Sequence, residues 1–289
     1  MPVRLKDIAA QLDLSVTTVS RALAGYSDVS PQTRERVLAT AAAMGYVPDA
    51  TAQRLQKQRT NTIGFIVPTF GPRFSDPFFS ELMAGIGNEA ARRNYDVLIS
   101  TVAPGPEESE VYNRHIKSRR VDGMLVVRTR RDDPRISKLL EAGLPFVAFG
   151  RTETSSGYPW IDTDGATGVE LAVQHLIALG HRNIGFVRSP EFLMFSALRW
   201  DAFRQVMSAN DLTVNPQWVL HGDLTQGTGK ALTGRLLGMG QRPTALLYDN
   251  DLMALGGMAR CRKEAWLPAA TFRLSVLTTS GQPSMLIPR

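Results

Sequence analysis

Hydrophobic residues in the first sixty positions recur at the three- and four-residue spacing that is typical of amphipathic helices. The pattern predicts one helix over residues 5–12 and a second over residues 16–24, with a connection too short for a strand. Ser15 precedes the second helix, where its hydroxyl can accept hydrogen bonds from the first amides of that helix. The side chains that we expect to pack between the two helices are Ile8, Ala9, Leu14, Val19 and Leu23.

A third helix is predicted to follow. Ser30 and Pro31 have the pattern of a capping residue and a first-position proline. The helix should run from Pro31 through Met44 and end at Gly45, because glycine readily adopts the left-handed conformation that ends helices. A tight turn between the first two helices, with a third helix behind them, predicts an N-terminal all-α helix-turn-helix unit.

The second helix has one face without apolar residues that need burial. The side chains on that face are small or polar and include one arginine, a combination that suits the major groove of DNA. There, arginine can pair with guanine, and the methyl groups of valine or threonine can contact thymine. The alternative is an ordinary amphipathic hairpin whose polar face is only solvated. The candidate major-groove contacts are Ser15, Val16, Thr17, Thr18, Ser20 and Arg21.

From Thr62 the pattern changes to short apolar runs that alternate with amphipathic helices. This alternation predicts parallel sheets covered by helices, in a two-lobed α/β core that resembles the periplasmic sugar-binding proteins. Open sheets of this kind bind ligands at the carboxyl ends of their strands, so we expect a ligand cleft there. The predicted strands are 63–67, 95–99, 123–127, 145–149, 183–187 and 245–248, and helices of the second lobe are predicted near 165–180, 196–209 and 226–238.

The composition limits the classes of function. With 289 residues, of which 43% are hydrophobic, the chain can hold a small headpiece and a two-lobed core. No apolar run approaches about 18 residues and no signal peptide is recognisable, so we expect a cytoplasmic, nucleoid-associated protein with no membrane partner. The single cysteine, Cys261, excludes an internal disulfide, and with four scattered histidines it predicts no metal site and no cofactor.

The charge supports binding to nucleic acid without deciding it. The formal net charge is +6, of which residues 1–60 contribute +3. This charge attracts phosphate only modestly for each subunit, so we expect a homodimer that binds two half-sites of a palindromic double-stranded DNA operator. A tetramer is also compatible with the sequence.

The segment after the third helix makes the resemblance to a known family specific. It reads Tyr46-Val47-Pro48-Asp49-Ala50-Thr51-Ala52-Gln53-Arg54-Leu55. The chain resembles the headpiece of the lactose-repressor (LacI) family almost continuously from Leu5 to Leu55, and the likeness continues to about Met258. The resemblance implies a DNA-binding headpiece over 1–48, a hinge helix and linker over 49–61, and an effector-binding and dimerisation core over 62–289.

The resemblance implies a second contact with DNA. In the family, paired hinge helices open the minor groove with a leucine, and the matching residues here are Ala52 and Leu55. Unstacking a base step costs a few kcal/mol, which the contacts permitted by bent DNA offset. The alternative is that Leu55 packs within the linker.

The effector pocket is also implied by the resemblance. The loop after the first strand places Asp76, Phe78 and Phe79 in the pocket wall, although Phe79 is equally well explained as an anchor for the next helix. Aromatic faces beside polar groups suit sugar rings. The complete set of effector candidates is Asp76, Phe78, Phe79, Arg151, Asp164, Phe195, Arg199, Asn250 and Asp251.

Two of these candidates have clear chemistry. Arg199 can grip vicinal hydroxyls or a carboxylate with its planar guanidinium, unless it forms a structural salt bridge to Asp201 or Asp251. Asn250 offers a donor and an acceptor to a pair of hydroxyls. Apolar pocket positions, which packing explains equally well, are held by Leu193, Phe195 and Leu224.

The resemblance stops after Met258. We interpret the tail as a reading-frame change near residues 260–266, because the codons permitted for residues 276–289 can spell a family-like stretch one base out of step. If the tail is native instead, we expect the second lobe to lack strands and to leave an open sheet edge. On either interpretation the second lobe is expected to be incomplete.

These patterns together predict a sequence-specific transcriptional regulator, a repressor controlled by a small-molecule effector, with a sugar as the leading choice. One alternative is the solute-binding protein of a transport system, which the headpiece and the missing export signal disfavour. Another is a C-terminally damaged regulator that no longer senses ligand. An enzyme is not expected, since no nucleophile elbow or P-loop is present, and the glycines of residues 222–230 are expected to precede a helix without the pattern of a phosphate cradle.

Overall fold

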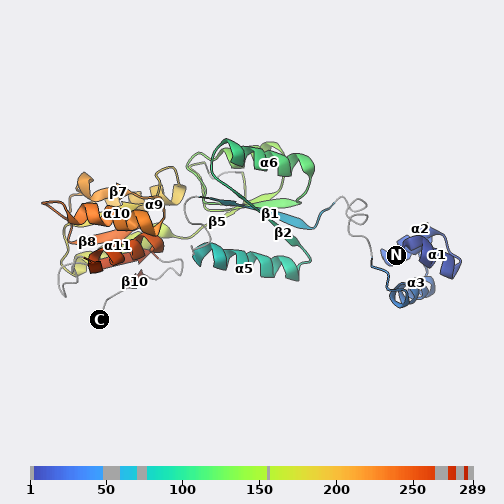
Figure 1. Ribbon diagram of the computed structural model, residues 1–289. Helices are drawn as coiled ribbons and strands as arrows, with labels where there is room; N and C mark the ends of the chain where they lie inside the picture. The colour runs from blue at the N-terminus through green and yellow to red at the C-terminus, as the bar shows by residue number, and fades with distance from the viewer. Residues whose placement is uncertain are drawn as a thin grey trace. The chain divides into compact units, whose positions relative to one another are not determined.

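The computed structural model describes residues 3–47, 59–69, 77–154, 157–263, 273–277 and 283–285. The chain divides into two compact units, Met1–Arg59 and Thr60–Arg289. The first unit is the helical headpiece, blue in Figure 1, and the second is the α/β core. The predicted hinge helix falls almost wholly on residues 48–58, outside the described residues.

The headpiece consists of α1 (Leu5–Leu12), α2 (Val16–Leu23) and α3 (Pro31–Ala43). Both predicted caps are present. The Thr18 amide donates to Ser15 Oγ over 3.0 Å, and the Thr33 amide donates to Ser30 Oγ over 3.2 Å. These bonds satisfy amides that would otherwise lack a partner at the start of each helix, so the helix limits follow from local sequence.

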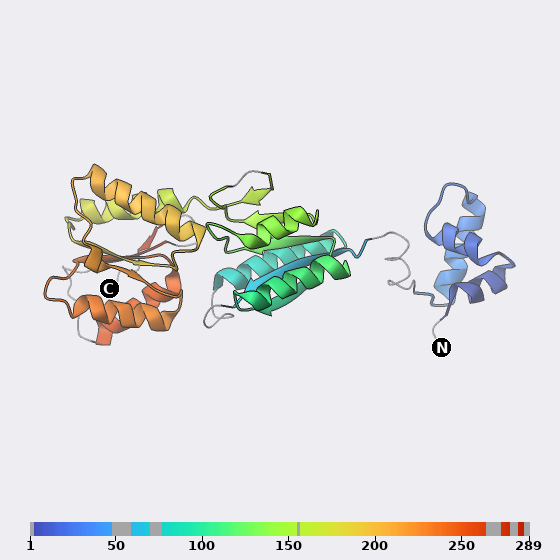
Figure 2. The ribbon, with the colours of Figure 1, turned by 90° about the horizontal axis from the view of Figure 1, so that it is seen from above.

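The three helices, seen together in blue in Figure 2, enclose one small core. Ile8 and Val19 are fully buried at the predicted contact of α1 and α2. Val29, between α2 and α3, is also buried, so the connection between these helices is anchored from within. The buried members of this core are Ile8, Ala9, Val19, Ala22, Val29, Val37 and Ala41, with Leu14 and Leu23 partly buried against them.

The first lobe of the core contains a five-stranded parallel sheet in the order β2-β1-β3-β4-β5. Along β1, Phe65 and Val67 face α5 while Ile66 faces α6 and α7, so helices cover both faces of the sheet (Figure 1). The elements are β1 (Thr62–Pro68), α5 (Pro77–Arg92), β2 (Asp96–Val102), α6 (Pro106–Ser118), β3 (Gly123–Val127), α7 (Pro134–Glu141), β4 (Phe146–Phe149) and β5 (Trp160–Ile161).

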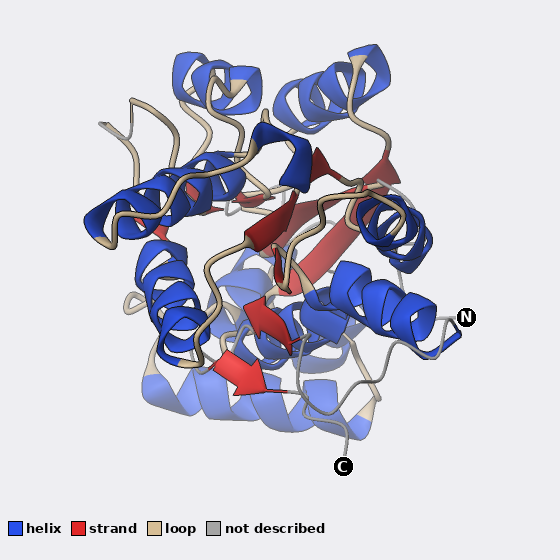
Figure 3. Ribbon diagram, turned by 90° about the vertical axis from the view of Figure 1, so that its left-hand side faces the viewer, coloured by secondary structure: helices blue, strands red, loops and turns tan. Residues whose placement is uncertain are grey.

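The second lobe repeats this plan in the sheet order β10-β9-β8-β6-β7. Figure 3 looks onto this lobe and shows helices around its strands. Phe186 and Leu247 pack against α8 and α9, whereas Val187 and Leu246 pack against α10 and α11. The elements are α8 (Gly165–Ala178), β6 (Ile184–Arg188), α9 (Met194–Ala209), a 3-10 turn (Pro216–Trp218), β7 (Val219–His221), α10 (Gln226–Leu237), β8 (Ala245–Tyr248), α11 (Asp251–Lys263), β9 (Arg273–Leu277) and β10 (Pro283–Met285).

The start of α10 divides the glycine-rich segment at 222–230. Gly222 precedes the helix as expected, whereas Gly227 and Gly229 lie inside it, within the helix predicted near 226–238. A Cβ at Gly229 would lie 2.1 Å from the Met253 carbonyl oxygen, and one at Gly256 would lie 2.0 Å from the Gln226 carbonyl oxygen. These glycines therefore let α10 and α11 approach closely, which is a packing role and not a phosphate-binding one.

The tail also differs from expectation. Two of its segments, β9 and β10, join the second sheet where the sequence analysis expected missing strands. Strand β9 pairs in parallel with β8, and β10 pairs with β9 in antiparallel orientation. Alternation of apolar and polar residues around Leu274 and Val276 has the two-residue period of a strand, which accounts for this placement.

Backbone hydrogen bonds join the two lobes beside their sheets. The Arg131 amide donates to the Phe192 carbonyl, and the Met194 amide donates to the Thr129 carbonyl, each over 3.0 Å. Between them, Arg130 and Leu193 form an antiparallel bridge. The loop after β3 and the loop after β6 are thus held together, which brings the carboxyl ends of strands from both sheets to one region.

Candidate functional site

The predicted DNA-reading face lies on α2 and the residue before it. Ser15, Val16, Thr17 and Arg21 are exposed, and 47% of the Val16 surface is accessible to solvent. Thr18 and Ser20, the other two candidate contacts, are half-buried. Thr17 and Arg21 are four residues apart and so share one side of the helix. The two predicted minor-groove residues, Ala52 and Leu55, lie outside the described residues.

The turn after α2 folds back over the end of that helix. Gly25 adopts φ +79°, its amide donates to the Ala22 carbonyl, and the Tyr26 amide donates to the Arg21 carbonyl over 3.1 Å. This is the bonding pattern of a Schellman motif, which requires the left-handed conformation that glycine adopts without strain. The motif returns Tyr26 to Arg21, whose guanidinium carbon lies 5.0 Å from the centre of the tyrosine ring.

Arg21 also faces a carboxylate to which the sequence analysis gave no role. Arg21 Nε donates to Asp28 Oδ1 over 3.2 Å, and Nη2 lies 2.5 Å from Asp28 Oδ2. The two side chains remain 44% and 52% exposed, so solvent screens this ion pair. Sequence spacing alone could not indicate the pair, since seven residues and a turn separate its partners.

In the core, Arg199 of α9 lies at the carboxyl end of β8. Its Nη1 donates to the Asp249 carbonyl oxygen over 2.5 Å and lies 3.8 Å from Asp249 Oδ1. The sequence analysis named Asp201 or Asp251 as possible salt-bridge partners of Arg199, but Asp249 is the carboxylate that the structure places against it, and Asp201 pairs with Arg204.

Asp249 is fully enclosed in the second lobe, with 1% of its surface exposed. Its Oδ2 accepts hydrogen bonds from the Ser189 amide and from Ser196 Oγ, over 2.7 and 3.1 Å. Burial raises the pKa of Asp249 above its usual range, and the attraction of Arg199 together with these hydrogen bonds offsets only part of that rise. Ionisation of Asp249 is therefore costly in the folded core.

Several effector candidates gather around Arg199. Its guanidinium carbon lies 4.9 Å from the centre of the Phe195 ring. A Cβ at Gly165 would lie 2.7 Å from Arg199 Nε, so the arginine packs directly on the start of α8. Asp164 caps that helix by accepting from the Thr167 amide over 3.0 Å, and the two hydrogen bonds from Thr167 lower the pKa of Asp164. Arg199, Phe195 and the start of α8 thus form one cluster.

Asn250 follows Asp249 and is engaged within the fold. Its side-chain amide donates to the Leu224 carbonyl over 3.1 Å, and its Oδ1 accepts from the Met253 amide over 3.2 Å. These bonds cap α11 and hold the loop after β7, where Leu224 adopts φ +70°. Asp251 is the first residue of α11. The predicted ligand role of Asn250 and Asp251 stays a prediction.

The first lobe contributes aromatic residues near the end of β3. Phe79 is 2% exposed and packs in the core with Phe65, as its interpretation as a helix anchor predicts. Phe78 is half-buried, with its ring centre 5.6 Å from that of Phe149. Arg128, which the sequence analysis did not name, places its guanidinium carbon 4.5 Å from the centre of the Phe79 ring. Asp76 lies outside the described residues.

Arg151 follows β4 and is held by its own lobe. Its Nε donates to Asp162 Oδ2 over 3.0 Å, and its guanidinium carbon lies 5.4 Å from the centre of the Trp160 ring. Arg151 therefore braces the segment that leads into the second lobe. Its positive charge also adds to the hydrogen bonds from Thr167 in lowering the pKa of Asp164, which links Arg151 electrostatically to the start of α8.

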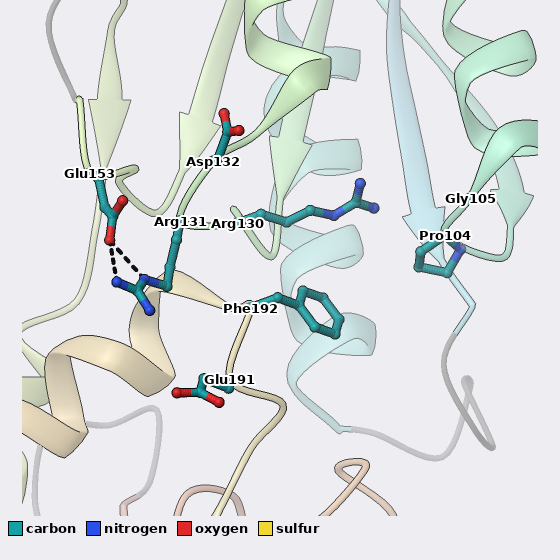
Figure 4. Close-up of a pocket in the computed structure, with 8 residues that line it drawn as sticks. All are labelled: Pro104, Gly105, Arg130, Arg131, Asp132, Glu153, Glu191 and Phe192. Atoms are coloured by element: carbon teal, nitrogen blue, oxygen red, sulfur yellow. Dashed lines mark hydrogen bonds and ion pairs between the residues drawn. The ribbon is translucent and has the colours of Figure 1, made fainter.

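A pocket of about 810 Å³ lies where the two lobes are bonded together (Figure 4). Arg130 extends across it and is held by an ion pair to the buried Glu108. Arg131 pairs with Glu153 at its edge over 2.6 Å. None of the described effector candidates lines this pocket, so sequence reasoning missed it. Its lining residues are Pro104, Gly105, Arg130, Arg131, Asp132, Glu153, Glu191 and Phe192.

Among the described residues, no group of histidine, cysteine or acidic side chains is arranged to hold a metal ion. In the same part of the chain, no helix combines the length and apolar character needed to cross a membrane.

Comparison with protein families accounts for both units. Residues 4–49 match the model of bacterial regulatory proteins of the lacI family. Residues 60–275 match the model described as periplasmic binding proteins and sugar binding domain of the LacI family. The chain belongs to the LacI family. As a LacI-family protein it is a DNA-binding transcriptional regulator with a periplasmic-binding-protein-like core, which confirms the predicted fold class, and the family is not one of enzymes.

Individual relatives of this LacI-family chain cover nearly all of it. The transcriptional regulator AglR of Rhizobium meliloti is 35% identical over 272 residues, which are 94% of this chain and 76% of the relative. The transcriptional repressor CytR of Escherichia coli is 31% identical over 90% of this chain and 75% of its own length.

Solved structures agree with the sequence relatives. The lac repressor dimer bound to operator and the anti-inducer ONPF matches with a TM-score of 0.80 and 27% identity, covering 95% of this chain and 82% of that one. The complex of the regulator CelR with cellobiose matches with a TM-score of 0.67 and 28% identity, covering 94% of this chain and 81% of that one.

Proposed function

We propose that this LacI-family regulator is a repressor that binds a palindromic operator as a homodimer and is controlled by a sugar. The observation that carries the sugar assignment is the cluster at the carboxyl end of the second sheet, where Arg199 lies between Asp249 and the Phe195 ring. A charged donor beside an aromatic face suits a ring that carries hydroxyl groups. The cellobiose bound to the relative CelR supports this class of effector.

Dimeric binding follows from the size and charge of the headpiece. One headpiece offers a single reading helix and a formal charge of only +3 over residues 1–60. Two copies on two half-sites double the phosphate contacts and the number of bases read. The operator-bound dimer of the lac repressor is the precedent among the relatives.

The roles within each headpiece are proposed residue by residue. Val16, Thr17 and Arg21 would enter the major groove, because they share the exposed side of α2. Ser15, Thr18 and Ser20 would contact DNA at the edge of this face. Ala52 and Leu55 would enter the minor groove. Asp76, Phe78, Arg151 and Asp164 would complete the effector pocket around Arg199.

The test begins by selecting an operator. The full-length protein selects duplexes from a randomised DNA library, and the enriched duplex is titrated at about 50 and 200 mM salt. Over this range the affinity of a protein that makes about 6–10 phosphate contacts falls steeply. A panel of mono- and disaccharides is then added. We expect a palindromic duplex bound by two subunits and a change in its affinity caused by one sugar.

Two results would contradict the proposal in different ways. Enrichment of no sequence by the folded protein would contradict operator binding. Specific binding that no sugar alters, together with no sugar-dependent rise in thermal stability, would contradict the sugar assignment and would favour a damaged regulator that no longer senses ligand.

A further inference from the structure

The contact between Arg21 and Asp28 leaves a particular part of the guanidinium open. A guanidinium has five N–H donors, and Asp28 engages Nε and Nη2 along one side of the group. The donors at the far end, from Nη1 and the second hydrogen of Nη2, point away from that carboxylate. This end carries the pair of donors that matches O6 and N7 of guanine.

We propose that Asp28 is a positioning residue that fixes the Arg21 guanidinium in the orientation needed to read guanine. The proposal rests on the proposed function, in which Arg21 enters the major groove. Asp28 need not touch DNA for this role. It would remove the rotational freedom of a long side chain before binding, so that less conformational entropy is lost when Arg21 meets its base.

The turn that carries Asp28 is held at three points. The Schellman motif at Gly25 fixes its start, and Arg34 of α3 donates to the Tyr26 carbonyl over 2.6 Å. The next residue after Asp28, Val29, is 7% exposed in the headpiece core. Because Tyr26 before it and Val29 after it are anchored, Asp28 faces Arg21 from a defined position, and the Tyr26 ring supports the guanidinium from one face.

The proposal can be separated from a simple effect of charge. A carboxylate beside the DNA-reading face repels phosphate, so removing it should strengthen binding to any DNA. A positioning carboxylate has the opposite effect on the cognate duplex, because its loss leaves Arg21 disordered. The two roles therefore predict changes of opposite sign in operator affinity.

The test uses the full-length protein and two probes, the duplex selected from the randomised library and a scrambled duplex of equal length. Asp28→Ala and Asp28→Asn are compared with Glu35→Gln, which removes a negative charge from the exposed side of α3. We expect both Asp28 variants to bind the selected duplex about three- to tenfold more weakly, the loss that corresponds to ordering one long side chain. Binding of the scrambled duplex should become about twofold tighter in all three variants.

Arg21→Ala and a chemically altered duplex complete the test. Replacing the contacted guanine with 7-deazaguanine removes N7, so the penalty for this change should be smaller in Asp28→Ala than in the parent protein. Asp28→Glu should recover part of the lost operator affinity. Circular dichroism shows whether each variant keeps its helices, and Asp28→Asn preserves the shape of the side chain.

The failures are distinguishable. If Arg21→Ala leaves operator affinity unchanged, the proposed base contact of Arg21 is wrong. If Arg21→Ala weakens operator binding while Asp28→Ala strengthens it or leaves it unchanged, the base contact stands and the positioning role of Asp28 is overturned.

Discussion

At the scale of single residues, two arginine–aspartate contacts differ in their surroundings. The pair of Arg21 and Asp28 is about half exposed, so solvent screens it and it contributes little to stability. Asp249, in contrast, is enclosed with Arg199 beside it. A buried charge without its partner is strongly destabilising, so the second contact also constrains the fold.

The first prediction concerns Arg199. Arg199→Ala should weaken binding of the sugar found in the panel by about tenfold to a hundredfold, the loss of a charge-assisted hydrogen bond in a partly buried site. Isothermal titration measures this affinity. Arg204→Ala, on the exposed side of the same helix, is the matched control and should leave it unchanged. Equal sugar affinities in the parent protein and Arg199→Ala would show that Arg199 does not contribute to sugar binding.

The second prediction concerns the pH dependence of stability. Because the folded pKa of Asp249 is raised, the folded core binds a proton more readily than the unfolded chain does. The contribution of Asp249 to stability is therefore largest below its unfolded pKa of 3.8 and is lost as pH rises through the folded value. Urea unfolding should show the parent protein gaining stability relative to Asp249→Asn as pH falls from about 7 to about 4.

Asp164 provides a control of opposite sign for this measurement. Hydrogen bonds from Thr167 lower its pKa, so its contribution is present above the unfolded value and is lost as pH falls through the folded value. Between about pH 7 and about pH 4 the contribution of Asp164 should stay nearly constant, and the parent protein should lose stability relative to Asp164→Asn only as pH falls below about 4. The account of Asp249 fails if both variants show the same slope.

Residue roles that depend on local sequence were predictable, and those that depend on the fold were not. The caps at Ser15 and Ser30 follow from the residues next to them, and the structure confirms both. Asp249, the partner of Arg199, lies fifty positions later in the chain, directly after β8, and no spacing rule indicated it. Asp28 was missed for the same reason, because a turn brings it to Arg21.

At the scale of elements, close helix packing determines where side chains can be tolerated. Helices α10 and α11 meet at Gly229 and Gly256, where an added Cβ would approach a carbonyl oxygen to 2.1 and 2.0 Å. Gly85 on α5 has open space where its Cβ would be. The same substitution is therefore expected to have opposite effects in the two helices.

The third prediction uses this contrast. Gly256→Ala should destabilise the core by about 3 kcal/mol, since the helices must separate to admit a methyl group. Gly85→Ala should be neutral or stabilise by up to about 1 kcal/mol, because alanine has the higher helix propensity. Urea unfolding monitored by circular dichroism gives both values. A small loss of stability in Gly256→Ala would mean that α10 and α11 pack less closely than described.

The hydrophobic pattern predicted most elements because both sheets are covered on two faces. Strands of this kind read as continuous apolar runs, and β3 matches its predicted limits. The pattern placed Gly227 and Gly229 in a helix near 226–238 but did not reveal that α10 meets α11 at its glycines, since a helix contact depends on a partner element distant in sequence. The strands of the tail were missed because the resemblance was taken to stop after Met258, whereas the family match extends to residue 275, within β9.

At the scale of the whole molecule, the account requires that the core and the headpiece influence each other. Within the core, the bonds between the loops after β3 and β6 connect the two lobes beside the pocket at Arg130. A sugar that prefers one arrangement of these lobes would shift the protein toward it. If that arrangement also alters operator affinity, linkage requires operator binding to alter sugar affinity by the same factor.

The most direct measurement is therefore a complete binding cycle with the full-length protein. The affinity for the selected operator is measured with and without saturating sugar, and the affinity for the sugar is measured with and without saturating operator. The account predicts that both affinities change by one common factor, about 5- to 150-fold for typical coupling. The account is contradicted if each ligand binds tightly but neither changes the affinity for the other, because operator binding and sugar binding would then be uncoupled.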